Sequence, residues 1–484
     1  MNDAKAYLLL PLLWLSLAQH SFGIGGVDTA PPPAAPRGFN FTHPKEAKLD
    51  NGLRVIVAER LNLPLLAVEL IIRTGSEADP NNLAGTANLT GSLLTKGTEK
   101  MSAPEIVNAV ESLGGTIFSS GGSDNSNAGV LVMSSKAEPA LTILADVVLH
   151  PAFKQEELER LRRQLLDGLR VALQQPSSLA SYVVGRAVYG DGEYGHAAGG
   201  TPESLPAIQR ADIVKFYQSY YRPDNAALIF SGNITLEQGK GYAQQFFGEW
   251  KTSEVSSHSV NPSLANWKPT DLVVDMPEAG QASVNLTKPA IKRNSADYYS
   301  GLVANAVLGN GFSSRLNREI RIKRGLSYGA RSSLDMRRDS GAFTASAQTK
   351  NESAVDVALL LQTELKRLGT DPVEGDELTS REALLTGSYS RSMETNQGFA
   401  GQIAGLAVFN LPLDTLDKFI PSINAVTAKD VTVFASKYLM SPTSLVVVGK
   451  AAAFLEPLKK NFPGTRVIPQ AELDLNRADL VKQK

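Results

Sequence analysis

The first folded stretch of the chain contains short apolar runs of the kind that form β-strands. In segment 47–59, two apolar runs flank Asn51-Gly52, a dipeptide that favours the tight turn of a β-hairpin. A second strand is expected at 65–73, and it leads to a helix that follows Gly85. The fold is therefore expected to begin with strands and continue with a helix.

A capping-box pattern predicts the start of the next helix. Ser102 and Glu105 stand three residues apart with a proline between them, and the helix is expected to end at Gly114-Gly115. The pattern then predicts two strands, at 116–120 and 129–134, and two helices, starting at Ala137 and Gln155.

The end of the first half has a counterpart near the end of the chain. Residues 211–232 predict an amphipathic helix, a proline turn and a buried strand, and the same order returns at 428–449. Three residues match at a constant offset of 218 positions: Asp212, Phe216 and Tyr220 with Asp430, Phe434 and Tyr438. Because solenoid repeats are far shorter, this repeat indicates a duplicated domain of mixed helices and strands.

The N-terminus has the pattern of a secretory signal peptide. A short polar stretch precedes the apolar run 7–18, which is too short to span a bilayer, and small residues permit cleavage near Ala18 or Gly23. A retained anchor is the alternative. The predicted segments are a signal peptide at 1–23, a flexible Pro/Gly-rich lead-in at 24–40, an N-terminal domain at 41–251, a linker at 252–268, a C-terminal domain at 269–465 and a C-terminal tail at 466–484.

Composition restricts the class of partner. The chain has 484 residues, of which 43% are hydrophobic and 20% charged, and its formal net charge is −1 with no long basic run. This argues against nucleic acid as a partner and against binding to a membrane surface. The chain has no cysteine, so disulfides and lipid attachment at a cysteine are excluded. Together with the signal peptide, this predicts a periplasmic or secreted protein.

Segment 85–98 reads GTANLTGSLLTKGT. It resembles the helix of pitrilysin/insulinase-type zinc peptidases, which carries the inverted motif H-x-x-E-H and commonly reads G-L-A-H-x-x-E-H-x-L-x-x-G-T. Aligned on the final Gly-Thr, Asn88 and Ser92 replace the two histidines and Gly91 replaces the glutamate. The two positions share a helix face, but an amide and a hydroxyl are poor zinc ligands and glycine supplies no base.

The histidines lead to the same expectation without any alignment. The chain has five, and none lies within five residues of another: His20, His43, His150, His196 and His258. No helix can therefore offer a two-histidine zinc face. Asp167 is the acid nearest to the expected place of the family's third ligand, and we interpret it as a solvated helix charge. His196, in Tyr-Gly-His-Ala, is interpreted as a surface or helix-capping residue.

Segment 309–329 reads GNGFSSRLNREIRIKRGLSYG. It resembles the family segment G-x-G-x-S-S-R-L-x-x-x-x-R-x-x-x-G-L-x-Y, whose arginine and tyrosine bind the substrate carbonyl and its developing oxyanion at the metal site. The matching residues here are Arg321 and Tyr328. A guanidinium and a phenol supply the hydrogen-bond donors that an oxyanion needs. The alternative is that Arg321 pairs with a surface acid and Tyr328 packs in the core.

Gly325-Leu-Ser-Tyr-Gly329 also satisfies G-x-S-x-G, the nucleophile elbow of serine hydrolases. That elbow needs a strand before the serine and a helix after it. Here a helical pattern at 314–323 precedes Ser327 and a strand-like run at 330–336 follows. The order is reversed, and Ser327 is not expected to be a nucleophile.

The resemblance covers roughly residues 40 to 465 and implies an α+β fold of two similar domains, each a mostly antiparallel sheet covered by helices. It implies a clam-like chamber closed with a partner chain. The expected function is that of a non-catalytic, zinc-free subunit of a heterodimeric metallopeptidase. Such a subunit holds no metal, while its zinc-bearing partner carries H-x-x-E-H and both bind peptide substrates. The alternative is a non-enzymatic peptide-binding or structural homologue.

Overall fold

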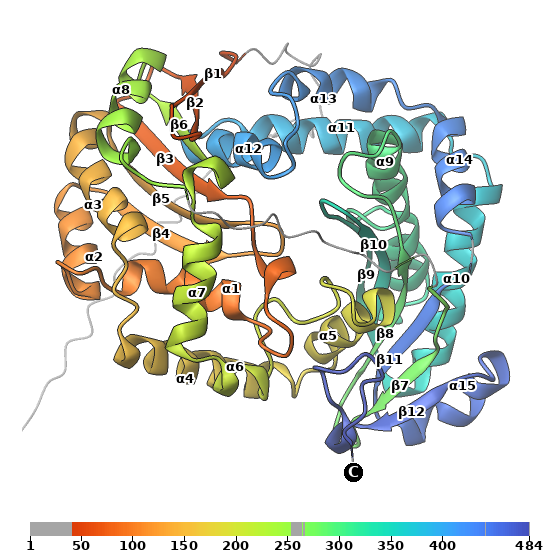
Figure 1. The fold of residues 1–484 in the computed structure, drawn as a ribbon. Helices are drawn as coiled ribbons and strands as arrows, with labels where there is room; N and C mark the ends of the chain where they lie inside the picture. Colours follow the sequence, from red (N-terminus) through yellow and green to blue (C-terminus); the bar gives the residue numbers. More distant parts are fainter. Residues whose placement is uncertain (1–40, 253–263, 265–266, 441, 484) are drawn as a thin grey trace, which may run out of the picture. The chain divides into compact units, whose positions relative to one another are not determined.

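Two six-stranded sheets form the framework of the protein (Figure 1). The structure is a computed structural model that describes residues 41–252, 264, 267–440 and 442–483. The predicted signal peptide and lead-in, and most of the predicted linker, lie outside the described residues. Trp267, at the linker's end, donates its indole N–H to the carbonyl oxygen of Ala187 over 3.0 Å.

The first sheet has the strand order β1-β2-β6-β3-β5-β4. Its members are β1 (Lys45–Lys48), β2 (Arg54–Glu59), β3 (Leu65–Ile72), β4 (Thr116–Gly121), β5 (Ser126–Met133) and β6 (Ala226–Gly232). β1 and β2 form the hairpin predicted around Asn51-Gly52, where Gly52 has a φ of 95°. β2 and β6 run parallel, and the remaining neighbours run antiparallel.

The second sheet has the order β12-β7-β11-β8-β10-β9. Its members are β7 (Leu272–Asp275), β8 (Ala282–Pro289), β9 (Ser327–Met336), β10 (Gly341–Thr349), β11 (Ser444–Gly449) and β12 (Arg466–Pro469). β12 pairs parallel with β7, and Leu473, Leu475 and Leu480 are buried after it. The segment expected to be a C-terminal tail is therefore part of the second half, because its apolar residues complete a core.

Helices cover both sheets. Those of the first half are α1 (Thr86–Leu93), α2 (Ala103–Ser112), α3 (Ala137–Leu149), α4 (Gln155–Ala172), α5 (Pro176–Tyr189), α6 (Ser204–Ala207), α7 (Arg210–Tyr220) and α8 (Leu236–Phe247). Those of the second half are α9 (Tyr298–Leu308), a π-helix (Asn317–Lys323), α10 (Ala354–Thr370), α11 (Gly375–Ser392), α12 (Asn396–Val408), α13 (Thr415–Asn424), α14 (Ala428–Tyr438) and α15 (Leu455–Asn461). None of these helices combines the length and apolar character that a membrane span requires.

The duplication predicted from the repeat is visible in the topology. The spatial order β2-β6-β3-β5-β4 in the first sheet corresponds to β7-β11-β8-β10-β9 in the second. The first two strands of each series run parallel. The matched helices α7 and α14 carry the same ring pairs, with centroids 4.7 Å apart for Phe216 and Tyr220 and 4.9 Å apart for Phe434 and Tyr438. The expected α+β fold of two similar halves is confirmed.

Each half also covers the sheet of the other with one helix. α5 packs on β8 and β11, and its Leu179 and Val183 join a core with Val274 and Val446. In return, α12 packs on β3 and β6, and the amide of Asn396 donates to the carbonyl oxygen of Leu65 over 3.0 Å. The two halves therefore share their cores.

An ion pair with a buried carboxylate adds a second link between the halves. Arg338, in the β9–β10 hairpin, donates to Glu77 Oε1 over 3.1 Å and to the carbonyl oxygens of Arg73 and Asp124 over 2.9 and 2.6 Å. Glu77 is 2% exposed, and burial raises its pKa to about 7 against the opposing effect of Arg338. Asp124 also accepts the hydroxyl of Tyr194 over 2.6 Å.

Candidate functional site

Helix α1 carries the positions where the family has its zinc motif. Threonine, asparagine and glycine are weak helix formers, so α1 depends on its surroundings. The buried carboxylate of Asp79 caps its first turn by accepting the N–H groups of Gly85 and Ala87, each over 2.7 Å. His196 lies beside this cap, with Nε2 3.2 Å from Asp79 Oδ2. Burial raises the pKa of Asp79, and the His196 contact opposes that rise.

Of the two interpretations of His196, the structure supports the one that links it to a helix cap. Its side chain is 14% exposed and contacts the carboxylate that caps α1, so it is not a free surface residue. The signal for this pairing was absent from the local sequence, because Asp79 and His196 are 117 residues apart.

The face of α1 where a zinc base would stand is pressed against the backbone of strand β4. A Cβ added at Gly91 would lie 2.5 Å from the carbonyl carbon and oxygen of Ser120. The contact is mutual, because a Cβ at Gly121 would lie 2.3 Å from the carbonyl oxygen of Ala87. The amide of Asn88 donates to the carbonyl oxygen of Gly121 over 3.2 Å. Position 91 therefore has no room for a glutamate.

These residues do not fit a zinc ion. Asn88 is bonded to the strand, Ser92 is a neutral hydroxyl, and Gly91 leaves no space for a base. Asp167 on α4 is 70% exposed and pairs with Arg170 over 2.8 Å, which confirms its interpretation as a solvated charge. Within the described part of the chain, no cluster of three or more histidine, cysteine, aspartate or glutamate residues could hold a metal.

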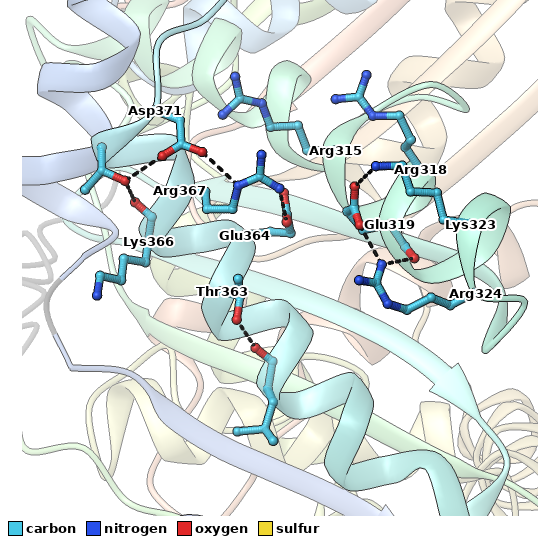
Figure 2. A network of polar contacts seen from close by, with 12 residues as sticks. Arg315, Arg318, Glu319, Lys323, Arg324, Thr363, Glu364, Lys366, Arg367 and Asp371 are labelled. Carbon is cyan, nitrogen blue, oxygen red and sulfur yellow. Dashed lines mark hydrogen bonds and ion pairs between the residues drawn. The ribbon is translucent and has the colours of Figure 1, made fainter.

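The predicted Arg321 and Tyr328 lie in the second half, on the π-helix and on the edge strand β9. The two groups of site residues predicted from the sequence thus do not form one cluster. π-Helices are rare and are frequently found at functional sites. This one is held by Glu319, which is 9% exposed and accepts both Lys323 and Arg324 over 2.5 Å (Figure 2). Burial would raise the pKa of Glu319, but these two cations hold it below its ordinary value.

Five cations stand between positions 315 and 324, and four of them are paired. Arg315 lies 2.8 Å and Arg318 3.7 Å from carboxylate oxygens of Glu377 on α11, and Glu319 takes Lys323 and Arg324. Arg321 has no ion pair with any carboxylate that the structure describes. Its guanidinium carbon instead lies 4.8 Å from the ring centroid of Phe312.

Tyr328 is 90% exposed, and a register shift explains why. Ala330 pairs with Ala347 and Ser327 with Thr349, so Tyr328 and Gly329 together oppose one residue of β10. Such bulges re-aim side chains near functional sites. Ser327 closes the bulge, since its hydroxyl donates to the carbonyl oxygen of Gly329 over 2.7 Å.

The geometry removes two alternatives that the sequence left open. Arg321 does not pair with an acid among the described residues, and Tyr328 does not pack in the core. The π-helix precedes Ser327 and strand β9 contains it, so the nucleophile-elbow order is absent, as predicted. The catalytic role of Arg321 and Tyr328 stays a prediction.

Sequence reasoning missed Phe312. It is 64% exposed and stacks under Arg321, which places an aromatic face and a cation on one surface. The available signal was a large aromatic residue between Gly311 and Ser313, in a turn where exposed aromatics are uncommon.

Comparison with family models gives two adjoining matches. The model described as insulinase (peptidase family M16) matches residues 54–201. The model described as the peptidase M16 inactive domain matches residues 207–383. The boundary between the two matches falls before α7, within the first half of the chain.

Relatives and solved structures agree with these matches. An uncharacterized zinc protease from Bacillus subtilis is 24% identical over 404 residues, covering 84% of this chain and 98% of its own. A peptidase M16 inactive domain from Pseudomonas fluorescens has a TM-score of 0.78 at 28% identity, covering 84% of this chain and 98% of its own. A protease from Helicobacter pylori has the same TM-score at 19% identity, covering 85% of this chain and all of its own, and shows the fold alone.

Proposed function

Because this chain belongs to the insulinase (M16) peptidase family, we propose that it is the zinc-free subunit of a heteromeric bacterial peptidase. In this proposal a partner subunit carries H-x-x-E-H and its zinc. The present chain contributes substrate binding and oxyanion stabilisation, and it cleaves no peptide alone. It acts in the periplasm, after removal of its signal peptide.

The first support is the contact between α1 and β4. A chain that had lost only its ligands would keep space for them, but here Gly91 and Gly121 close that space with backbone. In this proposal, the hydrolysis uses a metal that is held outside this chain. A partner of the same family supplies one at an equivalent helix.

The observation that carries the proposal is the unpaired Arg321. A cation whose role is to stabilise a helix pairs with a carboxylate, as the four cations near Arg321 do. Arg321 is left outside this network, with its side chain over Phe312 and available to an anionic or developing anionic group. Guanidinium donors suit such a group because their fork geometry matches paired oxygens.

The role of the pair follows from its chemistry. In peptide hydrolysis, negative charge develops on the scissile carbonyl oxygen, and donors aimed at that oxygen lower the barrier. Arg321 supplies charged N–H donors and Tyr328 a phenolic O–H. The exposure of both side chains allows them to reach a substrate that the partner's metal site holds.

The test begins with the tagged mature chain, recovered from its native cell envelope and analysed by mass spectrometry. We expect a stoichiometric partner with intact H-x-x-E-H and a peptidase activity that a zinc chelator abolishes. If the chain elutes alone or as a homodimer, the subunit proposal fails.

The reconstituted complex then tests the residues. Arg321→Ala should lower kcat/KM by about 10²–10³, the usual cost of losing an oxyanion donor. Tyr328→Phe should act in the same direction, because it removes only the hydroxyl. The matched control is Arg318→Ala, which removes an exposed arginine from the same helix. Equal activities for Arg321→Ala and Arg318→Ala would contradict the catalytic role.

A non-enzymatic peptide-binding or structural homologue is the second candidate. The exposed aromatic side chains of Phe312 and Tyr328 favour it, since such side chains can hold a peptide without cleaving it. A chain that binds peptides, purifies without a zinc-bearing partner and loses binding in Phe312→Ala would support this candidate.

A further inference from the structure

Away from the α1 and Arg321 segments, the first half contains a cavity of about 390 Å³ between α3, α8 and the loop before α2. We call it the α3–α8 pocket. Its apolar lining includes Met101, Ile143, Leu149 and Phe246, and Asp146 lies among them. Its size is that of small-molecule sites, which combine apolar walls with few polar groups.

Asp146 is buried without a hydrogen bond. It is 8% exposed, and neither carboxylate oxygen accepts a bond from any group in the described structure. The cation nearest to it is Lys100, whose Nζ lies 3.9 Å from Oδ1 and whose side chain is 76% exposed. At that distance Lys100 makes no hydrogen bond, so both buried oxygens lack a donor and are reached only when the side chains over them move aside.

The position of Asp146 within α3 makes a nearby positive charge more favourable. Asp146 lies in the last turn of the helix, which contains no basic residue. The C-terminal end of a helix carries partial negative charge, so a carboxylate there is disfavoured. Burial without a hydrogen bond adds a further cost to folding. A bound cation would relieve both.

Backbone hydrogen bonds hold one wall of the pocket, the loop before α2. The N–H of Glu99 donates to the carbonyl oxygen of His150 over 3.1 Å, and the N–H of Ala152 donates to that of Gly97 over 3.0 Å. The hydroxyl of Thr98 accepts the N–H of Met101 over 2.9 Å. The loop before α2 is thus tied to the end of α3, so this wall is in place without a ligand.

We propose that the α3–α8 pocket binds an organic ammonium ion with a small apolar body. The ammonium donates to Asp146 Oδ1 and Oδ2, the apolar body lies against Met101, Ile143 and Phe246, and Lys100 moves out to solvent. A bare metal cation fits less well, because calcium and magnesium need several oxygen ligands and this lining is mostly apolar. The proposal requires neither a partner chain nor Arg321, and so it is independent of the proposed function.

The test is calorimetric titration of the mature chain with 2-phenylethylammonium, and with 2-phenylethanol as its uncharged counterpart. We expect saturable binding of the ammonium and at least about tenfold weaker binding of the alcohol, because a charged hydrogen bond is lost. Asp146→Asn should weaken ammonium binding by a similar factor. Asp167→Asn, a matched change at an exposed helical position, should have no effect.

Lys100→Met provides a second variant that leaves the carboxylate in place. It removes the competing cation, so the ammonium should bind as tightly as in the natural chain or more tightly. The proposal is overturned if the ammonium does not bind, if the alcohol binds equally well, or if Asp146→Asn binds like the natural chain. Weaker binding in Lys100→Met would also overturn it, because Lys100 would then be part of the site.

Discussion

The two halves of the chain share a fold but treat the same helix–strand contact differently. In the first half, α1 lies against the edge strand β4 with Gly91 and Gly121 at the contact, where backbone meets backbone. In the second half, Gly309 brings the end of α9 against Ser332 of the edge strand β9. The π-helix then stands between α9 and β9, where the first half has α2.

The difference shows that two copies of a duplicated domain can pack the same region in different ways. The first half has glycines at this contact, where helix and strand backbones meet closely. The second half uses paired charges to hold a π-helix on which Arg321 is exposed, and the bulge in β9 leaves Tyr328 exposed. In the first half the region is filled by backbone packing, and in the second half it exposes the hydrogen-bond donors of Arg321 and Tyr328.

The largest effect is expected when the glutamate of the family motif is introduced at position 91. Gly91→Glu places a Cβ 2.5 Å from the backbone of Ser120, which cannot move without disturbing β4. We expect a loss of about 3 kcal/mol or more in the free energy of unfolding, measured by urea denaturation. The triple change of Asn88 to His, Gly91 to Glu and Ser92 to His should also bind no zinc in equilibrium dialysis.

Gly168→Glu is the matched control. Gly168 lies in α4, and a Cβ there would meet nothing within 4 Å. Replacing a helical glycine with a better helix former should leave stability equal or raise it by up to about 1 kcal/mol. If Gly91→Glu were as stable as Gly168→Glu, the close packing of α1 on β4 would be refuted.

The link between the halves is tested by Arg338→Ala. This change removes the cation from Glu77 and leaves the carbonyl oxygens of Arg73 and Asp124 without their donor. Because the remaining groups are buried, we expect a loss of about 3 kcal/mol at pH 7.5, measured by urea denaturation. Arg318→Ala breaks an exposed pair within the second half and should cost less than about 1 kcal/mol. Equal losses would mean that Arg338 does not link the halves.

Much of the fold was predictable from local pattern. The Asn51-Gly52 hairpin, the capping box at Ser102 and the helices starting at Ala137 and Gln155 all follow from the chemistry of neighbouring residues. The repeat between 211–232 and 428–449 predicted two similar halves because the same residues recur at one offset.

The remaining features depend on residues far apart in sequence. The contact between Gly91 and Ser120, the pairing of Arg338 with Glu77 and the cap of Asp79 with His196 leave no periodic signal. The motif suggested Arg321, but only the structure shows that its four cationic neighbours are paired. The exchange of α5 and α12 between the halves was also outside the reach of local patterns.

The pH dependence of stability tests the contact between Glu77 and Arg338 in a second way. Burial raises the pKa of Glu77 from its ordinary 4.5 to about 7, with Arg338 opposing the rise and Asp124 adding to it. The folded chain therefore binds more protons than the unfolded chain between these values, and its stability falls as pH rises from 4.5 to 7. The fall should be about 2 kcal/mol between pH 5 and 7.5. Denaturation of Glu77→Gln at both pH values should lack this component, and an unchanged slope would assign it to other groups.

The smallest expected effect compares two matched helix caps. Asp212 accepts the N–H of Gln209 at the start of α7, and Asp430 accepts the N–H of Thr427 at the start of α14, each over 2.8 Å. Asp430 also accepts the hydroxyl of Thr427 over 2.6 Å. Asp212→Ala should therefore cost about 0.5 kcal/mol and Asp430→Ala about 1 kcal/mol in urea denaturation. Both values are small because these caps are exposed to water, which replaces the lost acceptor. Equal losses would mean that the hydroxyl bond of Thr427 contributes nothing and that the two copies are energetically equivalent despite their different cap residues.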